Sequence, residues 1–132
     1  MRHLTIILLT FLISCSTSKE RNTGDDFRKY LSSLDNLDVP VTFDTKNDLK
    51  VKSRNYDTTL FQLFKHAWSM GPHGKIFEGD SIVVIVDITA CDVLVPLITT
   101  FNQQGQKLDS LNPYDRAGAD MGYESYEFVT IN

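Results

Sequence analysis

Two apolar runs decide the fold: Ile82-Val83-Val84-Ile85-Val86-Asp87-Ile88, followed by Val93-Leu94-Val95-Pro96-Leu97-Ile98-Thr99-Thr100-Phe101. β-Branched residues are frequent in both runs, and such residues favour strands. Because the link between them is short, we expect the runs to pair as an antiparallel hairpin at the centre of a sheet. Their nearly continuous apolar character indicates either burial on both faces or a sheet with an unusually apolar exterior.

Weaker strand signals surround this hairpin. Residues 102–105 form a turn in which Gly105 can adopt a positive φ, so residues 106–111 should return as a third strand and residues 123–131 as a fourth. Short links between successive strands make a β-meander the expected topology. Two further segments could be short strands: residues 39–43, which Pro40 restricts to a sheet edge or a strand start, and residues 49–52.

Two segments show helical spacing. Phe27, Tyr30, Leu31 and Leu34 follow the i, i+3, i+4, i+7 pattern, with Asp25 or Asp26 as the N-cap and residues 35–36 as the stop; residues 58–68 form the second helix, capped by Asp57 or Thr58. The Gly- and Pro-rich residues 69–74 should form a loop. We therefore predict one α+β domain over residues 25–132, an antiparallel β-meander of four or more strands with two short helices on one face.

The N-terminus carries a secretion signal. Arg2 precedes an apolar run over residues 4–13 that is too short to span a bilayer. The following Leu12-Ile13-Ser14-Cys15 resembles the lipobox of bacterial lipoproteins, in which the cysteine is acylated and becomes the mature N-terminus. The resemblance implies a cleaved signal peptide over residues 1–14, a lipidated Cys15 and a polar tether to residue 24. The alternatives are an ordinary secretory signal with an incidental cysteine and a buried N-terminal element.

Charge limits the partners. Cleavage after residue 14 removes one basic residue, Arg2, and no acidic residue, so the net charge changes from −4 to −5. An acidic domain argues against nucleic-acid binding and against electrostatic docking to anionic lipid. Attachment to the membrane would therefore depend on covalent lipid at Cys15, with no other cofactor. Ser16, rather than an aspartate, follows the cysteine, and the resemblance to lipoproteins then favours the outer membrane of the cell envelope.

No strong catalytic motif is present downstream. Cys91 with His66 or His73 has the residue types of a thiol nucleophile and its base, although the apolar surroundings of Cys91 favour an inert packed thiol. His66 and His73 could join Glu78 or Asp80 around a metal, but their spacing is irregular for a zinc site.

The C-terminal part has two further candidate sites. Asp115, Asp120 and Glu124 offer oxygen ligands in a glycine-containing loop, which suits calcium, and the alternative is a solvated acidic loop. Three tyrosines could form a binding face, since tyrosine adds contact area at low entropic cost, or could be ordinary strand residues: Tyr114, Tyr123 and Tyr126.

Several stretches resemble small uncharacterised lipoproteins of Bacteroidetes-type bacteria. These stretches are residues 27–37 running into 39–41, 55–57, 74–76, 95–101, Gly105 with 108–111, and 120–131. The resemblance implies an envelope location and a β-rich fold, and it implies no activity or site.

Together these observations favour a lipid-anchored cell-envelope protein that acts as a binding or assembly module, with another envelope protein as a candidate partner. The alternative is an envelope enzyme of unknown class that uses Cys91, His73 and Asp87. A closed pocket that holds these polar groups would favour the enzyme, whereas an exposed apolar or aromatic patch would favour the binding module.

The anchor is directly testable. Cys15→Ala should abolish acylation and leave the signal peptide uncut, because only the cysteine at the cleavage point can carry the lipid. Mass spectrometry of the mature N-terminus measures both effects. Cleavage of the native chain at another residue, with an unmodified Cys15, would contradict the lipoprotein interpretation.

Overall fold

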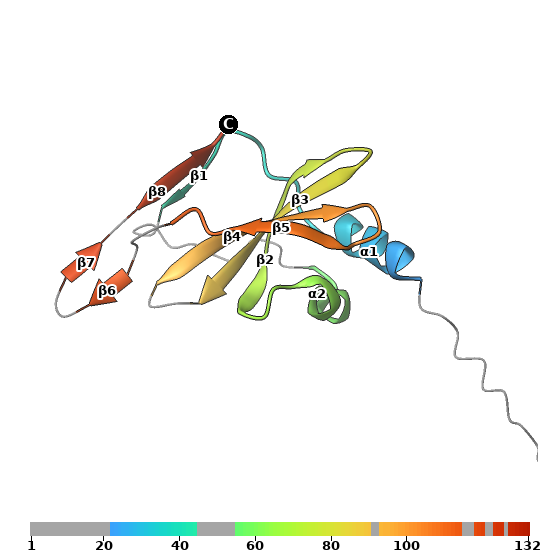
Figure 1. Cartoon of the computed structure of the whole chain (residues 1–132), viewed down its shortest axis with the longest axis horizontal. Coiled ribbons are helices and arrows are strands. Elements are labelled where there is room, and N and C mark those ends of the chain that lie inside the picture. The colour runs from blue at the N-terminus through green and yellow to red at the C-terminus, as the bar shows by residue number, and fades with distance from the viewer. Residues whose placement is uncertain (1–21, 45–54, 91–92, 115–117, 121–122, 126) are drawn as a thin grey trace, which may run out of the picture.

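The computed structural model describes residues 22–44, 55–90, 93–114, 118–120, 123–125 and 127–132 (Figure 1). Its elements are, in chain order, α1 (Thr23–Ser32), β1 (Val41–Asp44), α2 (Thr58–Phe64), β2 (Ser69–Glu78), β3 (Ile82–Ala90), β4 (Leu94–Asn102), β5 (Lys107–Leu111), β6 (Gly118–Asp120), β7 (Tyr123–Ser125) and β8 (Phe128–Ile131). The main sheet is an antiparallel meander in the order β2-β3-β4-β5. The predicted α+β fold class is therefore confirmed.

The β3–β4 hairpin is the centre of this sheet, as the sequence predicts. The two strands pair from Ile82 opposite Asn102 to Ala90 opposite Leu94 without a register shift. Successive residues of β3 point to opposite faces, and Val83, Ile85, Val86 and Ile88 are all buried. The sheet is thus buried on both faces at its centre, which decides between the two alternatives left by the sequence.

Both helices cover one face of the sheet. Their apolar side chains form an aromatic core cluster with Leu34, Val83, Ile85 and Phe101, and its helical members are Phe27, Tyr30, Leu31, Phe61 and Phe64. Phe27 lies 4.9 Å from Phe64 and 5.2 Å from Phe101 between ring centroids, so α1, α2 and β4 meet at one side chain. Gly105, with φ of 79°, lies directly against Phe27 and Phe64 at the β4–β5 turn.

The helix ends differ in detail from the prediction. Asp57 caps α2, since its Oδ1 accepts hydrogen bonds from the backbone N–H groups of Thr59 and Leu60 at 2.9 and 3.0 Å. Asn22 occupies the N-cap position of α1, so the prediction of Asp25 or Asp26 as its cap is wrong. Both acids lie in the first turn instead, where their charges still complement the helix dipole.

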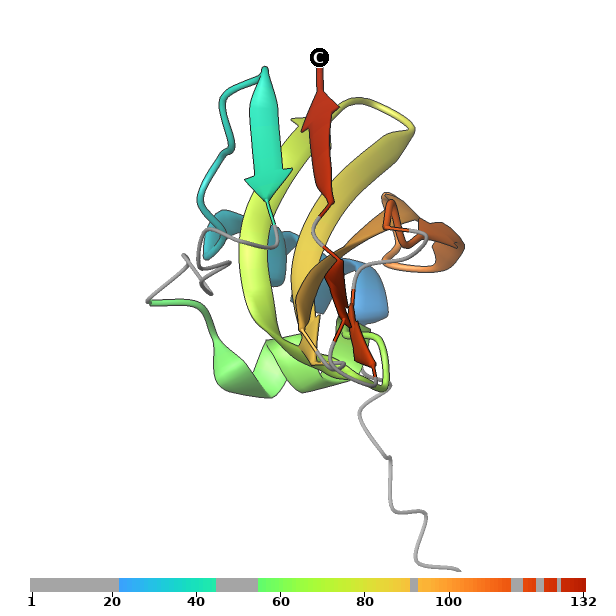
Figure 2. The same cartoon turned by 90° about the vertical axis from the view of Figure 1, so that its left-hand side faces the viewer.

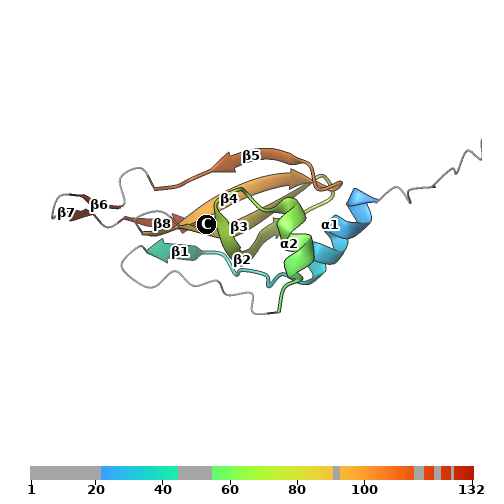
Figure 3. The same ribbon diagram turned by 90° about the horizontal axis from the view of Figure 1, so that it is seen from below.

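The other face of the sheet is covered by a two-stranded ribbon (Figure 2). β8 pairs with β1, from Val41 opposite Ile131 to Asp44 opposite Phe128. Phe43 packs with Val86 and Ile88 in a second core cluster, which Val129 and Ile131 flank. The predicted fourth meander strand over residues 123–131 is therefore wrong: β7 pairs with β6, β8 pairs with β1, and β2 completes the meander. Figure 3 shows α1 and α2 toward one end of the main sheet and the β1–β8 ribbon toward the other.

Residues 69–74 form the first part of β2, so the predicted loop is wrong. The strand accommodates its glycines and proline through register shifts at Ser69/Gly71, Pro72/Gly74 and Lys75/Phe77. Residues 35–37 run beside the outer edge of β2 and satisfy part of its backbone. The Lys75 N–H donates to the Asp35 carbonyl at 2.8 Å, and the Leu37 N–H donates to the Lys75 carbonyl at 2.7 Å. A sequence pattern cannot show this edge contact.

Some expectations concern residues outside the described part of the chain: the signal peptide, Cys15, most of the tether, and the short strand at 49–52. The end of the predicted tether, residues 23–24, belongs to α1. Within the described ranges, the helices are all too short or too polar to cross a bilayer.

Gly74 permits the close approach of residues 35–37, and this contact can be tested. A Cβ atom at position 74 would lie 2.7 Å from the Asp35 carbonyl oxygen and 2.8 Å from Leu37 Cγ. Gly74→Ala should therefore lower the free energy of unfolding by roughly 1–3 kcal/mol. Gly24→Ala is the matched control, because a Cβ there meets nothing closer than 3.5 Å, and it should be neutral or stabilise α1 by up to about 1 kcal/mol. Equal effects in denaturant melts would contradict the assigned contact.

Candidate functional site

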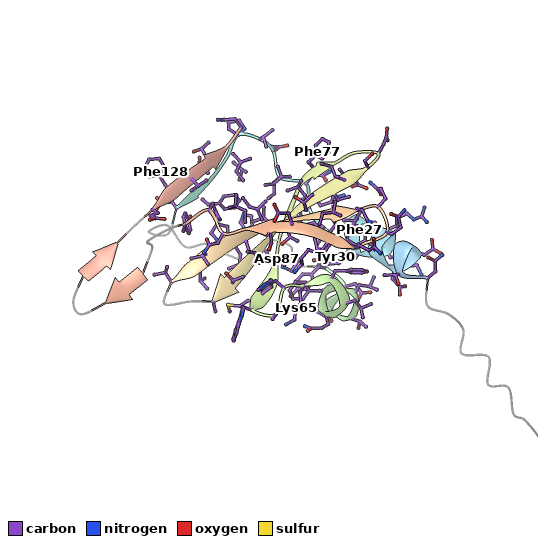
Figure 4. The ribbon with its side chains drawn as sticks, viewed as in Figure 1. Phe27, Tyr30, Lys65, Phe77, Asp87 and Phe128 are labelled. Carbon is purple, nitrogen blue, oxygen red and sulfur yellow. The ribbon has the colours of Figure 1, made fainter. Side chains whose placement is uncertain are left out.

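Asp87 is the one charged residue within the central apolar run, and β3 places it inside the protein. It continues the alternation of Val83 and Ile85, so it lies on the face that the helices cover. Its side chain is only 5% exposed. Figure 4 shows Asp87 close to Tyr30 of α1, and the carboxyl group contributes, after burial, to the raised pKa of the Tyr30 hydroxyl.

The Asp87 carboxyl group has incomplete hydrogen bonding. Ser69 Oγ donates to Oδ2 at 2.9 Å, and Ser69 is itself buried. Oδ1 is buried and accepts no hydrogen bond from the described residues. Burial raises the pKa of Asp87 to about 6, against the opposing effects of the Ser69 hydroxyl, the Lys107 charge, the His66 backbone N–H and the Lys65 charge. At neutral pH the protein therefore holds a largely ionised, poorly solvated carboxylate.

Two threonines add further polar side chains to the face of the sheet on which Asp87 lies. Thr89 follows Asp87 by two residues on β3, and its hydroxyl donates to the Val95 carbonyl at 3.2 Å. Thr99 lies opposite Ile85, and its hydroxyl is buried without a partner among the described residues. Polar side chains on this face thus run from Thr99, which lies opposite the core residue Ile85, past Asp87 to Thr89 near the end of β3.

A half-open cavity of about 220 Å³ lies at this end, lined by His66, Trp68, Thr89, Val95, Leu97 and Asn112. We call it the Trp68 cavity. Asp87 does not line the cavity, but three lining residues are its neighbours: Leu97 is its cross-strand partner, Thr89 follows it on the same face, and the His66 backbone N–H acts on its carboxyl group. Trp68 is 72% exposed. The cavity therefore combines a solvent-facing indole with an apolar wall, and the buried Asp87 lies next to its lining residues.

Of the residues proposed for an enzyme, His73 and Asp87 lie on opposite faces of the sheet. His73 is buried and packs edge-on against Phe43, with 5.4 Å between ring centroids, so it lies on the ribbon side of the sheet. Asp87 lies on the helix side, and the sheet separates the two. Cys91 is outside the described residues.

The sequence predicts two kinds of metal site, one with His66 and His73 and one for calcium. Glu78 forms an ion pair with Lys75 at 2.6 Å, and the described part of the chain holds no group of three His, Cys, Asp or Glu side chains suited to a metal. For the predicted calcium site, the register sets Asp120 opposite Tyr123 and Glu124 opposite Ala119, whereas Asp115 lies outside the described residues. Calcium binding there stays a prediction.

Tyr114, one of the three tyrosines of the predicted binding face, does not lie on the surface. Tyr114 is buried in the second core cluster, where burial raises the pKa of its hydroxyl to about 12. It fills the interior and is not part of an exposed surface. Tyr123 lies in β7, and Tyr126 is outside the described residues. Sequence reasoning placed Trp68 at the end of the second helix and missed its role at the cavity; the available signal was a single tryptophan directly before a Gly- and Pro-rich stretch.

Comparisons of the chain with protein-family models, with curated proteins and with solved structures find no match. We therefore infer function from the geometry of the Trp68 cavity and of Asp87. An apolar cavity with a few polar groups at its inner end is the usual form of a small-ligand site.

The buried carboxyl group makes stability depend on pH in a defined direction. With a native pKa of about 6 against an ordinary aspartate pKa of 3.8, folded Asp87 binds its proton more tightly than unfolded Asp87. Its contribution to stability is therefore present at low pH and is lost as the pH rises through the native pKa. Relative to Asp87→Asn, the native protein should lose roughly 2–3 kcal/mol of unfolding free energy between about pH 4 and about pH 7.

Denaturant melts across this range measure the difference between the two proteins. Asp80→Asn, which removes an exposed carboxyl group near the β2–β3 turn, is the matched control. A constant difference between the native protein and Asp87→Asn over the whole range would show that the Asp87 carboxyl group is not desolvated.

Proposed function

We propose that this protein is a lipid-anchored binding module of the cell envelope and that the Trp68 cavity is its ligand site. The observation that carries the proposal is the position of Trp68, a large aromatic side chain held at 72% exposure beside a half-open apolar cavity. Tryptophan combines a large contact area with a single N–H donor, and it is enriched at binding sites for this reason. Leaving it in water gains nothing for folding, whereas a ligand would cover it.

The arrangement of polar groups favours binding over catalysis. Among the described residues, Asp87 receives hydrogen bonds from the Ser69 hydroxyl and the His66 backbone N–H, and the side chains of Asp87 and Ser69 are buried. A nucleophile and its base must meet each other and the substrate, and the His73–Asp87 pair of the enzyme alternative is separated by the sheet.

The envelope location is part of the same proposal. The lipobox-like sequence ending at Cys15 and the acidic net charge of −4 support attachment through covalent lipid rather than through a basic surface. The outer membrane is the proposed destination, and another envelope protein is a proposed partner. The membrane is thus contacted through the lipid, which leaves the cavity free for its ligand.

Trp68 is the only tryptophan of the chain, so its fluorescence reports directly on the cavity. Trp68→Ala should abolish ligand binding, measured by ligand-observed NMR with envelope extract fractions and then with the isolated ligand. The free energy of unfolding should change by less than about 1 kcal/mol, because the indole is exposed.

Leu63→Ala is the matched control, since Leu63 is also an exposed apolar residue but lies on α2 outside the cavity lining. It should leave binding unchanged. Ligands that bind Trp68→Ala as tightly as the native protein would place the binding site elsewhere.

A further inference from the structure

The starting observation is that two turns of the main sheet and the start of α1 lie together at one end of the molecule. The Gln103 side chain, in the β4–β5 turn, donates a hydrogen bond to the Gly79 carbonyl in the β2–β3 turn. A Cβ atom at Gly24 of α1 would lie 3.9 Å from the Gln104 Cα atom. Figures 1 and 3 show this grouping from two directions. We call it the turn end of the molecule, and it consists of residues 23–25, 79–81 and 103–106.

Three apolar side chains are exposed beside these turns: Phe77, Ile82 and Leu108. Phe77 lies opposite Val84, so it shares one face of the β2–β3 hairpin with Ile82. Leu108 lies in the register shift of β5 beside Thr100, and Thr100 is the other cross-strand partner of Val84. The three side chains are therefore at a similar level of the sheet. Exposed apolar side chains that gather in this way mark a contact with a membrane or with another protein.

The proposed lipid anchor favours the membrane as the partner of this patch. The described part of the chain begins at Asn22, next to the turn end, and residues 15–22 reach at most about 28 Å when fully extended. β2 runs from Ser69, which follows Trp68, to Glu78 at the turn end, and its ten residues span about 30 Å. A chain of this length cannot bring the end with the Trp68 cavity to the membrane in place of the turn end.

We propose that the turn end docks on the bilayer to which Cys15 is anchored, with Phe77, Ile82 and Leu108 buried among the lipid head groups and the first carbons of the acyl chains. The Trp68 cavity then faces away from the membrane. This inference rests on the lipid anchor of the proposed function, and it adds the orientation in which the ligand site is presented.

The charges near the turn end are compatible with a lipid surface. Asp80 is the only charged residue among residues 79–81 and 103–106. Glu78 forms an ion pair with Lys75 at 2.6 Å. Lys107 and Asp109, on either side of the third apolar residue, carry opposite charges. The two turns thus present a polar surface with little net charge, which meets zwitterionic lipid head groups without strong repulsion.

A patch of three side chains is sufficient because the anchor already holds it near the lipid. Binding to an interface grows with the apolar area that it buries, and the area here is too small to hold a free protein on a membrane. A covalent anchor makes docking an intramolecular step, in which a weak contact becomes effective. The lipid therefore attaches the protein, and the apolar patch sets its orientation.

The single tryptophan of the chain makes this orientation measurable. The lipid-anchored protein is reconstituted in phosphatidylcholine vesicles, with or without bromine on the acyl chains, because bromine quenches tryptophan fluorescence at close range. The native Trp68 should keep its emission in both vesicles. In a Trp68→Phe background, the reporter variant Phe77→Trp should lose emission in the brominated vesicles. Leu108→Trp in the same background is a second reporter with the same expected loss, so the test does not depend on the folding of one variant.

Phe128→Trp in the Trp68→Phe background is the matched control for the reporters. Phe128 is also an exposed aromatic residue, but it lies on β8 of the ribbon, and Figure 4 shows it away from Phe77 and from α1. Its emission should be the same in brominated and unbrominated vesicles. A denaturant melt of each variant checks that it is folded.

Ile82→Ser should weaken the docking, because it removes apolar area from the patch and leaves the reporter at position 77 in place. The ratio of docked to undocked protein should fall roughly three- to tenfold, which is measured as a smaller loss of emission from that reporter. Leu94→Ser is the matched control, since Leu94 is 38% exposed against 39% for Ile82 but begins β4 at the end of the sheet near the cavity. It should leave the quenching unchanged.

Vesicle flotation and mass spectrometry of Cys15 separate the possible failures. If Cys15 is acylated and the protein floats with the vesicles, but the reporters at positions 77 and 108 are quenched no more than the one at position 128, the docking inference is overturned and the proposed anchor and ligand site stand. Quenching of the native Trp68 would also overturn it, since the cavity would then face the lipid. A chain without lipid on Cys15 that does not float would overturn the anchor and this inference together.

Discussion

The uninterrupted pairing of β3 with β4 is the constraint on which the rest of this structure depends. Nine residue pairs, from Ile82–Asn102 to Ala90–Leu94, align without a shift and fix which side chains face each side of the sheet. Val83 and Ile85 then require cover on one side, which α1 and α2 supply, and Val86 and Ile88 require cover on the other, which the β1–β8 ribbon supplies. A shift by one residue would exchange the two faces and leave both covering layers without a matching surface.

The same register brings Asp87 into the interior. A strand that must bury Val83 and Ile85 on the helix side also places the next alternate residue there, whatever its chemistry. The carboxyl group is buried at that position, next to Ile85 of the aromatic core cluster along the same face and opposite Leu97 of the cavity lining. Its raised pKa and its open oxygen atom follow from this position rather than from any nearby charge. Fold and candidate site are therefore consequences of one alignment.

Local patterns predicted the elements, and contacts distant in sequence decided what the patterns missed. Alternation and helical spacing located β3, β4, β5 and both helices, and the cap at Asp57 was readable from its residue type. The glycines and proline of residues 69–74 favour a loop, yet residues 35–37 and β3 hold this first part of β2 extended. The pairing of β8 with β1 joins segments 88 residues apart, as the Thr42–Thr130 side-chain hydrogen bond illustrates. No periodicity within either segment encodes that choice.

The candidate site was predictable only in part for the same reason. Asp87 stands out in the sequence as a charge within an apolar run, and it was grouped with His73 and Cys91 as a candidate polar residue. The face on which each side chain lies separates His73 from Asp87, and the fold brings Trp68 and Asn112 together at one cavity, although no spacing rule connects them. The fold tolerates the buried Asp87 carboxyl group because two clusters of buried apolar side chains offset its free-energy cost. An isosteric asparagine or an apolar residue would fit β3 with less desolvation, so the carboxyl group at this position costs stability that the two core clusters supply.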